Sequence, residues 1–256
     1  MIDKTDMKAV LNELKDGRMI IVTDDEDREN EGDLLMAASC VRARDVNFMA
    51  KYGRGLICQA ITAERARALG LHAMAPDNNA ALSTAFTVSV DARGTTSTGI
   101  SAADRAATVR TIIRPDTKPD DLLRPGHIFP LIAHEKGVLG RRGHTEAGVD
   151  LARMAGLQPS ALICEIMDDD GTMARGDRLK ELAAEWGVAM VSIQDIIDFR
   201  LRNELKRVAE TRLPTDYGDF HLIAYEPEAF ALIKKTPAGV ASVADSSPEN
   251  AAKGSP

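Results

Sequence analysis

The sequence is poor in cysteine. Its three cysteines, Cys40, Cys58 and Cys164, are odd in number and form no CxxC pair. No set of cysteines and histidines has the spacing of a structural zinc site. Cys58 and Cys164 lie within apolar runs and are expected in the core. The cysteines therefore predict reduced thiols in a cytoplasmic protein.

Long apolar runs and an excess of positive charge are also absent. The first residues lack the basic and apolar regions of a signal peptide, and no apolar run approaches the ~18 residues that span a bilayer. The formal net charge of −7 argues against general affinity for nucleic acid. It does not exclude an anionic small molecule, because a local arginine cluster can override the overall sign. With 44% hydrophobic residues, the chain can bury one sizeable core.

An acidic stretch, residues 23–34, separates two apolar runs. It carries one base, Arg28, and seven carboxylates: Asp24, Asp25, Glu26, Asp27, Glu29, Glu31 and Asp33. So many carboxylates share a small volume only if a cation or protons neutralise some of them. An oxygen-preferring divalent metal, Mg²⁺ or Mn²⁺, suits such a set. The alternative is a solvated acidic loop.

A second cluster, residues 140–146, is read as Gly-Arg-Arg-Gly-His-Thr-Glu and lies where a helix is expected to begin. Free backbone N–H groups, the positive helix end, and Arg141 and Arg142 together predict an anion site. The alternative is a basic turn with an ordinary cap. His144 suits either a metal beside the acidic loop or a capping role. Thr145 can cap the helix or bind the anion.

Two further residues are candidates for proton transfer. His127 lies where a loop enters a strand, so it can present an imidazole to a cleft or only bond a turn. Glu165 interrupts an apolar run, where a carboxylate must be paired, metal-bound or protonated unless it faces solvent. Residues 95–101 offer donors to a phosphate but match no P-loop or dinucleotide motif. These residues together predict a phosphorylated small molecule, a divalent metal and one or two acid/base groups.

Apolar periodicity predicts alternating strands and helices. Strands are expected at residues 19–22, from 34 to about 41, and at 55–61, 85–90, 127–133, 161–167, 188–193 and 220–225; helices are expected at 5–16, 45–53, 62–70, 102–113, 145–155, 177–187 and 195–206. This order predicts the α/β (α+β) class, with a mixed sheet covered by helices in a single compact domain, residues 1–206. Residues 207–256 would form a short C-terminal extension, disordered from about residue 236 because it is rich in Ala, Ser, Pro, Lys and Gly.

Four motifs resemble the 3,4-dihydroxy-2-butanone-4-phosphate synthase family. They are Asp-Arg-Glu-Asn-Glu-Gly-Asp at 27–33, Thr-Gly-Ile-Ser-Ala-Ala-Asp-Arg at 98–105, Arg-Pro-Gly-His-Ile-Phe-Pro at 124–130 and Arg-Gly-His-Thr-Glu at 142–146. The resemblance covers roughly residues 3–206. It implies a lyase of riboflavin biosynthesis that converts D-ribulose 5-phosphate to 3,4-dihydroxy-2-butanone 4-phosphate and formate, with Mg²⁺ or Mn²⁺ and no organic cofactor. It also implies a homodimer with the site near the subunit interface.

By matching positions, the resemblance implies roles for individual residues. Glu29 and His144 would be metal ligands, and His127 and Glu165 would be the acid/base pair. The implied substrate-binding residues are Arg28, Glu29, Asp33, Arg141, Arg142, Gly143, His144, Thr145 and Glu165, with Arg141 and Thr145 on the phosphate. The chemistry fits, because enolisation, dehydration, skeletal rearrangement and loss of C4 need charge stabilised on adjacent oxygens and protons moved at neutral pH.

The residues after 206 resemble the opening of GTP cyclohydrolase II, from Arg207 to Tyr225. No cysteine cluster follows to hold the catalytic Zn²⁺ of that enzyme, so no cyclohydrolase activity is expected. Two alternatives stay open: a metal-dependent sugar-phosphate phosphatase or isomerase, and a non-catalytic relative that partners a separate cyclohydrolase. The sequence does not assign the metal used in the cell or the function of the tail. It also assigns no role to Cys58 or to five of the loop carboxylates.

Overall fold

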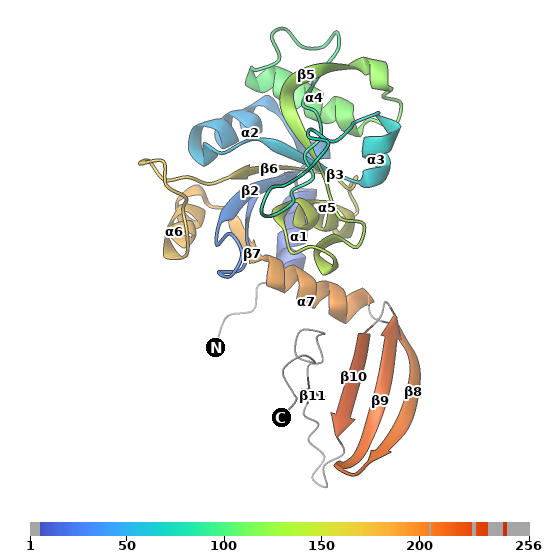
Figure 1. Ribbon diagram of the computed structural model, residues 1–256. Helices are drawn as coiled ribbons and strands as arrows, with labels where there is room; N and C mark the ends of the chain where they lie inside the picture. The colour runs from blue at the N-terminus through green and yellow to red at the C-terminus, as the bar shows by residue number, and fades with distance from the viewer. Residues whose placement is uncertain (1–5, 205, 227–228, 235–242, 245–256) are drawn as a thin grey trace. The chain divides into compact units, whose positions relative to one another are not determined.

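The computed structural model describes residues 6–204, 206–226, 229–234 and 243–244 (Figure 1). The chain divides into two compact units, Met1–Ile197 and Asp198–Pro256. Apart from residues 243–244, the segment expected to be disordered lies outside the described residues.

A seven-stranded mixed sheet forms the centre of the first unit, which confirms the predicted class. Its strands, in the order β4-β5-β3-β6-β2-β1-β7, are β1 Ile20–Thr23, β2 Gly32–Ala37, β3 Cys58–Ile61, β4 Val90–Ala92, β5 Leu122–Ile132, β6 Ala161–Glu165 and β7 Ala189–Ser192. The pairs β3–β5 and β1–β7 are parallel, and the other neighbouring pairs are antiparallel. The interior strands β1 and β2 are almost wholly buried, as their apolar runs predict.

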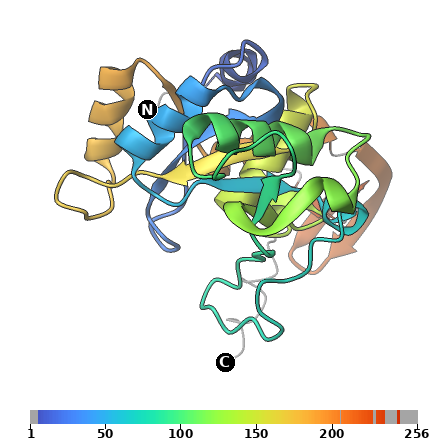
Figure 2. The ribbon, with the colours of Figure 1, turned by 90° about the horizontal axis from the view of Figure 1, so that it is seen from above.

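Helices cover both faces of this sheet. They are α1 Met7–Lys15, α2 Ala43–Phe48, α3 Ala63–Ala68, α4 Ala102–Ile113, α5 His144–Met154 and α6 Asp177–Trp186, with short turns of other helix types at Ala38–Cys40, Met49–Gly53, Pro119–Asp121 and Gly137–Leu139. The helix α7 Ile193–Glu204 begins at the end of this unit and continues into the second. Figure 1 shows α2 and α4 on one side of the sheet and α1 and α5 on the other, and Figure 2 looks through α2 and α4 onto the strands. None of the helices in the described ranges is long and apolar enough to cross a membrane.

The helix α5 packs very closely on the sheet. Gly148, near the middle of the helix, faces β6, where an added Cβ atom would lie 2.9 Å from the Cβ atom of Ala161. The absence of a side chain therefore sets the distance between α5 and the strands. This contact also limits the distance between the N-terminus of α5 and the sheet.

Several element boundaries differ from the predictions. The strand expected at 85–90 is wrong: Phe86 and Thr87 form only single bridges, and the regular strand β4 is Val90–Ala92. The strand expected at 127–133 begins earlier, because β4 pairs with residues as early as Leu122. The second strand ends at Ala37 and not near residue 41, since a 3₁₀ turn follows it.

The second unit is an antiparallel sheet in the order β11-β10-β9-β8. Its strands are β8 Lys206–Thr215, β9 Gly218–Glu226, β10 Ala229–Lys234 and β11 Val243–Ala244. The expected strand at 220–225 lies within β9. The sequence pattern missed β8 because its apolar residues are not gathered on a buried face: Val208 is 57% exposed. Whether residues 207–256 derive from a cyclohydrolase stays a prediction.

Candidate active site

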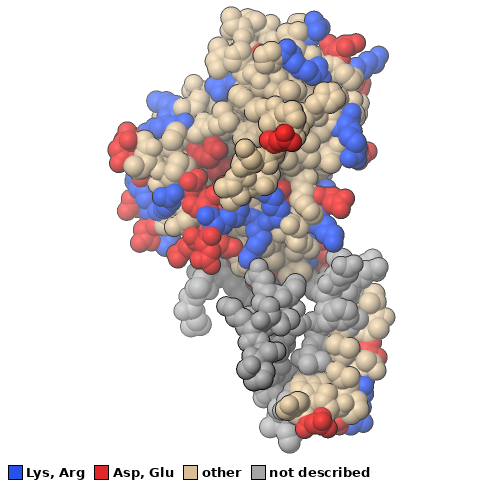
Figure 3. All heavy atoms as spheres, viewed as in Figure 1, with Lys and Arg blue, Asp and Glu red and all other residues tan. Residues whose placement is uncertain are grey.

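A pocket of about 210 Å³ opens where β2 begins and β6 ends. Seven of the predicted site residues line it: Arg28, Glu29, Asp33, Arg141, His144, Thr145 and Glu165. The other lining residues are Glu31, Cys58, Thr84, Phe86, Leu131 and Ile163. Figure 3 shows acidic and basic atoms close together on this face, over the loop that joins β1 to β2. The acidic loop, the N-terminus of α5 and the end of β6 therefore meet in one cavity.

The acidic loop is a fixed structure organised by Asp24. Its carboxylate accepts hydrogen bonds from the backbone N–H groups of Glu29 and Glu31, at 3.1 and 2.9 Å. Arg28 donates to the same carboxylate at 2.7 Å and also pairs with Glu29. This arrangement favours the fixed-loop interpretation over a solvated run of charges.

Asp24, Glu29 and His144 form a candidate cation site, because one possible ligand atom of each lies within 4.8 Å of the others. The Nδ1 atom of His144 is 3.5 Å from Glu29 Oε2 and 3.9 Å from Asp33 Oδ1. Two buried atoms, His144 Nε2 and Asp33 Oδ1, have no hydrogen-bond partner among the described residues. Buried polar atoms without a partner call for an explanation, and a bound cation with its water supplies one.

The charges in this cluster shift one another's protonation. The hydrogen bond from His144, aided by Arg28, holds the pKa of Glu29 at about 2 against the effect of burial. Burial raises the pKa of Asp33 to about 7. Burial alone would lower the pKa of His144, but Asp33 and the neighbouring carboxylates raise it to about 9. Positive charge is therefore favoured at this position.

Two residues of the predicted anion site, Arg141 and Thr145, lie at the start of α5. Both line the pocket, and the free N–H groups of the first helical turn lie beside them. Thr145 does not cap the helix, because the N-cap is Gly143. Arg142 does not line the pocket; it is half-exposed and pairs with Asp25 at 3.4 Å.

Glu165 lines the pocket. Its carboxylate therefore belongs to the candidate site and does not merely face solvent from the strand. It pairs with Asp33 across the β2–β6 register, so the two carboxylates occupy neighbouring strands. Its Oε2 atom accepts a hydrogen bond of 2.8 Å from the backbone N–H of Leu56. Cys58 lies in the same wall, where burial raises the pKa of its thiol and keeps it neutral.

His127 does not line the pocket. Its Nδ1 atom lies 2.8 Å from Oδ2 of Asp91, and its backbone N–H donates to Oδ1 at 2.9 Å. Because a carboxylate accepts hydrogen bonds, Nδ1 is the donor in this contact. Extending the β5–β3–β6 register places His127 two strands from Glu165, roughly 10 Å between Cα atoms.

Several of the donors in residues 95–101 are already engaged within the chain. The carboxylate of Asp104 accepts from the backbone N–H groups of Ser97 and Gly99, both at 3.1 Å, and from the Ser97 hydroxyl. Ser101 caps α4, accepting from the N–H of Asp104 at 3.0 Å. These bonds make the segment a rigid support behind Asp91 and His127, where Gly99 leaves no room for a Cβ atom.

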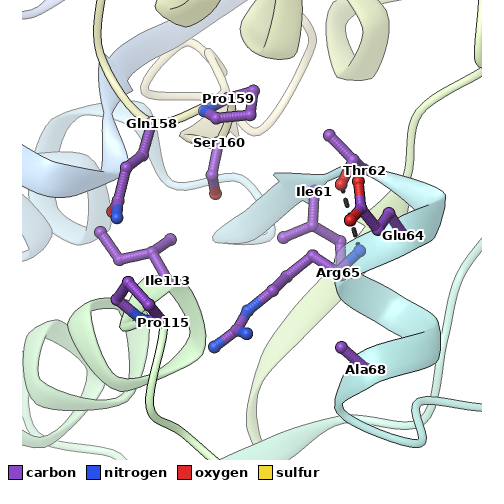
Figure 4. Close-up of a pocket in the computed structure, with 10 residues that line it drawn as sticks. All are labelled: Ile61, Thr62, Glu64, Arg65, Ala68, Ile113, Pro115, Gln158, Pro159 and Ser160. Carbon is purple, nitrogen blue, oxygen red and sulfur yellow. Dashed lines mark hydrogen bonds between the residues drawn. The ribbon is translucent and has the colours of Figure 1, made fainter.

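A second cavity, of about 240 Å³, lies at the opposite ends of β3 and β6 (Figure 4). Among its lining residues the guanidinium of Arg65 donates to the carbonyls of Ile112 and Arg114. The described lining contains one carboxylate, Glu64, and no histidine or cysteine. The groups suited to chemistry gather in the first pocket.

The comparisons with known proteins agree with this geometry. The sequence profile of 3,4-dihydroxy-2-butanone 4-phosphate synthase matches residues 8–199. The 3,4-dihydroxy-2-butanone 4-phosphate synthase of Pseudomonas syringae pv. tomato is 51% identical over 222 residues, which are 86% of this chain and 60% of that protein. The riboflavin biosynthesis protein RibBA of Aquifex aeolicus is 54% identical over 224 residues, 86% of this chain and 55% of that protein. The chain thus spans 55–60% of the length of these two relatives.

Solved structures show the same fold. RibBX, a two-domain 3,4-dihydroxy-2-butanone 4-phosphate synthase from A. baumannii, matches with a TM-score of 0.78 and 43% identity over 91% of this chain and 71% of that chain. A 3,4-dihydroxy-2-butanone 4-phosphate synthase in complex with two magnesium ions matches with a TM-score of 0.74 and 43% identity over 77% of this chain and 97% of that chain. The chain belongs to the 3,4-dihydroxy-2-butanone 4-phosphate synthase family.

Proposed function

We propose that the protein converts D-ribulose 5-phosphate to 3,4-dihydroxy-2-butanone 4-phosphate and formate, a step of riboflavin biosynthesis. The observation that carries this proposal is one pocket in which Glu29, His144 and Glu165 face Arg141 and Thr145. A ketose phosphate matches both halves, since it has adjacent oxygens for a metal and a phosphate for the helix end. The family match over residues 8–199 supports the same reaction.

The metal would be Mg²⁺ or Mn²⁺, held by Glu29 and His144. Carboxylate and imidazole ligands suit either ion, and the unpartnered His144 Nε2 and Asp33 Oδ1 atoms fit a hydrated cation. When bound, such an ion supplies positive charge to adjacent oxygens of the sugar. The related structure with two magnesium ions supports this choice.

The protein groups would bind the substrate and move its protons. Arg141, Thr145 and the N–H groups of α5 bind the phosphate. Arg28 and Asp33 border the sugar. Glu165, fixed by the N–H of Leu56, is placed as an acid/base group.

We also propose a homodimer in which His127 of one subunit completes the site of the other. His127 lies outside the pocket of its own chain, with 40% of its side chain exposed. Three apolar side chains of the same unit are also exposed: Leu56, Ile100 and Leu123 are 42%, 54% and 39% exposed. Such residues suit a subunit interface. The three free cysteines further support a reducing, cytoplasmic location.

Subunit mixing tests this arrangement. His127→Ala and Glu165→Gln proteins are each expected to be inactive. If the two residues act across the interface, a mixed dimer has one intact site, so random exchange restores about a quarter of wild-type activity. No recovery from verified mixed dimers would place both residues in one subunit's site.

Formate release from ribulose 5-phosphate tests the reaction itself. The expected result is formate production that needs Mg²⁺ or Mn²⁺, stops with chelator and is lost in Glu165→Gln. Glu185→Gln, a change in an exposed carboxylate of α6, is the control and should keep full activity. Inorganic phosphate without formate would indicate the phosphatase alternative. A folded, metal-loaded dimer that releases neither product would support the non-catalytic relative.

A further inference from the structure

We infer that Glu146 is a positioning residue for phosphate recognition, because it orients Arg141 and, through Arg141, holds the segment at residues 82–84 against the pocket. The inference rests on the proposed function, since it identifies what places the phosphate-binding arginine. Glu146 is the last residue of the fourth motif, where its type alone indicates no role.

Glu146 is a buried carboxylate with both oxygens engaged. It lies in the first turn of α5 and is 1% exposed. Its Oε2 atom accepts from Arg141 Nη1 at 2.8 Å, and its Oε1 atom accepts from the backbone N–H of His134 at 3.0 Å. A carboxylate bonded at both oxygens cannot rotate freely, so it presents a fixed acceptor to the guanidinium.

Arg141 connects this carboxylate to the opposite wall of the pocket. Its Nη2 atom donates to the carbonyl of Leu82 at 3.1 Å and to the hydroxyl of Thr84 at 3.0 Å. Thr84 and Arg141 both line the pocket, together with Thr145. The guanidinium of Arg141 carries five hydrogens. The single hydrogen on Nε and one of the two on Nη1 have no acceptor among the described residues, so they are available to a phosphate.

Gly143 is the residue that makes room for this ion pair. A Cβ atom at that position would lie 2.2 Å from Arg141 Nη1 and 2.6 Å from Glu146 Oε2. Any other residue would therefore push the guanidinium and the carboxylate apart. The role of Gly143 in binding thus follows from the geometry of its neighbours, since it contributes no side chain.

Asp150 offers a matched control on the same helix. It is also 1% exposed, lies one turn after Glu146 and accepts from the backbone N–H of Val138 at 2.8 Å. Both carboxylates therefore anchor the turn before α5 through a backbone N–H. Asp150 neither contacts Arg141 nor lines the pocket. A comparison of variants at the two positions therefore separates the effect of losing a buried carboxylate on α5 from the effect of losing the orientation of Arg141.

The experiment compares Glu146→Gln with Asp150→Asn. For each protein we would measure thermal stability, kcat and KM for ribulose 5-phosphate, and the inhibition constant of inorganic phosphate. Glutamine carries no charge and can accept only one of the two bonds that Glu146 accepts, so its hold on Arg141 is weaker. We expect KM and the phosphate inhibition constant each to rise about tenfold in Glu146→Gln, with a much smaller change in kcat. Asp150→Asn should lose comparable stability while KM and phosphate inhibition stay at wild-type values.

Two outcomes overturn the inference: wild-type phosphate inhibition in Glu146→Gln, or an equal rise in Asp150→Asn. Arg141→Lys keeps the charge but loses the fork, so it tests the same contact if Glu146→Gln does not fold. It should weaken phosphate binding by a similar factor, and a wild-type constant would also overturn the inference. If the wild-type protein releases no formate, the proposed function fails. Calorimetric binding of inorganic phosphate to the same variants then tests the inference separately.

Discussion

Replacing Glu29 with glutamine should destabilise the metal-free protein in a way that depends on pH. The carboxylate of Glu29 pairs with Arg28 and lies 3.5 Å from the His144 ring nitrogen. These partners hold its pKa at about 2, compared with an ordinary value of 4.5. Glutamine has nearly the same shape and no charge, so the substitution removes the ionic part of these contacts.

The difference between the two pKa values sets the size of the effect. It corresponds to at most about 3 kcal/mol of folding free energy at pH 7. Because the pKa is lower in the folded protein, the stabilisation is complete above about pH 4.5 and is lost as the pH falls towards 2. At pH 3.5 the contribution should be smaller by about 1 kcal/mol.

Urea unfolding in the presence of chelator measures this contribution at pH 7 and pH 3.5. The wild-type protein should exceed Glu29→Gln by about 1–3 kcal/mol at pH 7, with a smaller gap at pH 3.5. Glu31→Gln is the control, because burial raises the pKa of Glu31 and the carboxylates around it add to that effect. The unfolding free energy of the wild-type protein minus that of Glu31→Gln should therefore rise, and not fall, from pH 7 to pH 3.5.

Equal stability of the wild-type and Glu29→Gln proteins at pH 7, or a gap that does not change with pH, would refute the reasoning. Added Mg²⁺ gives a second measurement. At a hundred times its dissociation constant a bound ion stabilises the folded state by about 2.7 kcal/mol. The wild-type protein should show a rise in Tm with Mg²⁺, and Glu29→Gln should show little or none.

Further predictions concern the histidine support and the helix contact. Asp91→Asn should lower kcat for formate release by roughly 10²- to 10⁴-fold with KM nearly unchanged, because the amide no longer fixes the tautomer of His127; wild-type kcat would remove Asp91 from the reaction. Gly99→Ala should lower activity in the same assay, since the methyl group would overlap the Asp91–His127 pair; retained activity would show that the pair can move aside. Gly148→Ala should lower the free energy of unfolding in urea by about 1–2 kcal/mol, because the added methyl group meets Ala161; an equal or higher value would show that α5 can shift without loss.

The strands β1 and β2 and many of the residues that line the pocket could be predicted because their signals are local. The runs that form β1 and β2 are apolar on both faces, and the acidic loop between them joins two strands that pair with each other. The anion site depends on residues at one helix end, so its parts are adjacent in sequence. Such features need no knowledge of the strand order.

The supporting contacts could not be predicted, because they join distant segments. Asp91 and His127 are 36 residues apart, and Arg141 reaches Leu82 across 59 residues. These contacts depend on which strands become neighbours and on the path of irregular loops. Local periodicity carries neither kind of information, and Asp91 and Thr84 therefore have no distinctive pattern around them.

The pairing of Asp33 with Glu165 ties the chemistry of the pocket to the frame of the sheet. Successive side chains on a strand point to opposite faces, so a slip of β2 by one residue would turn Asp33 away from Glu165 and from the pocket. The same slip would move Leu34 and Leu35 to the wrong layers, which makes it very costly. The burial that stabilises these strands thus acts as an alignment device that keeps the two carboxylates side by side.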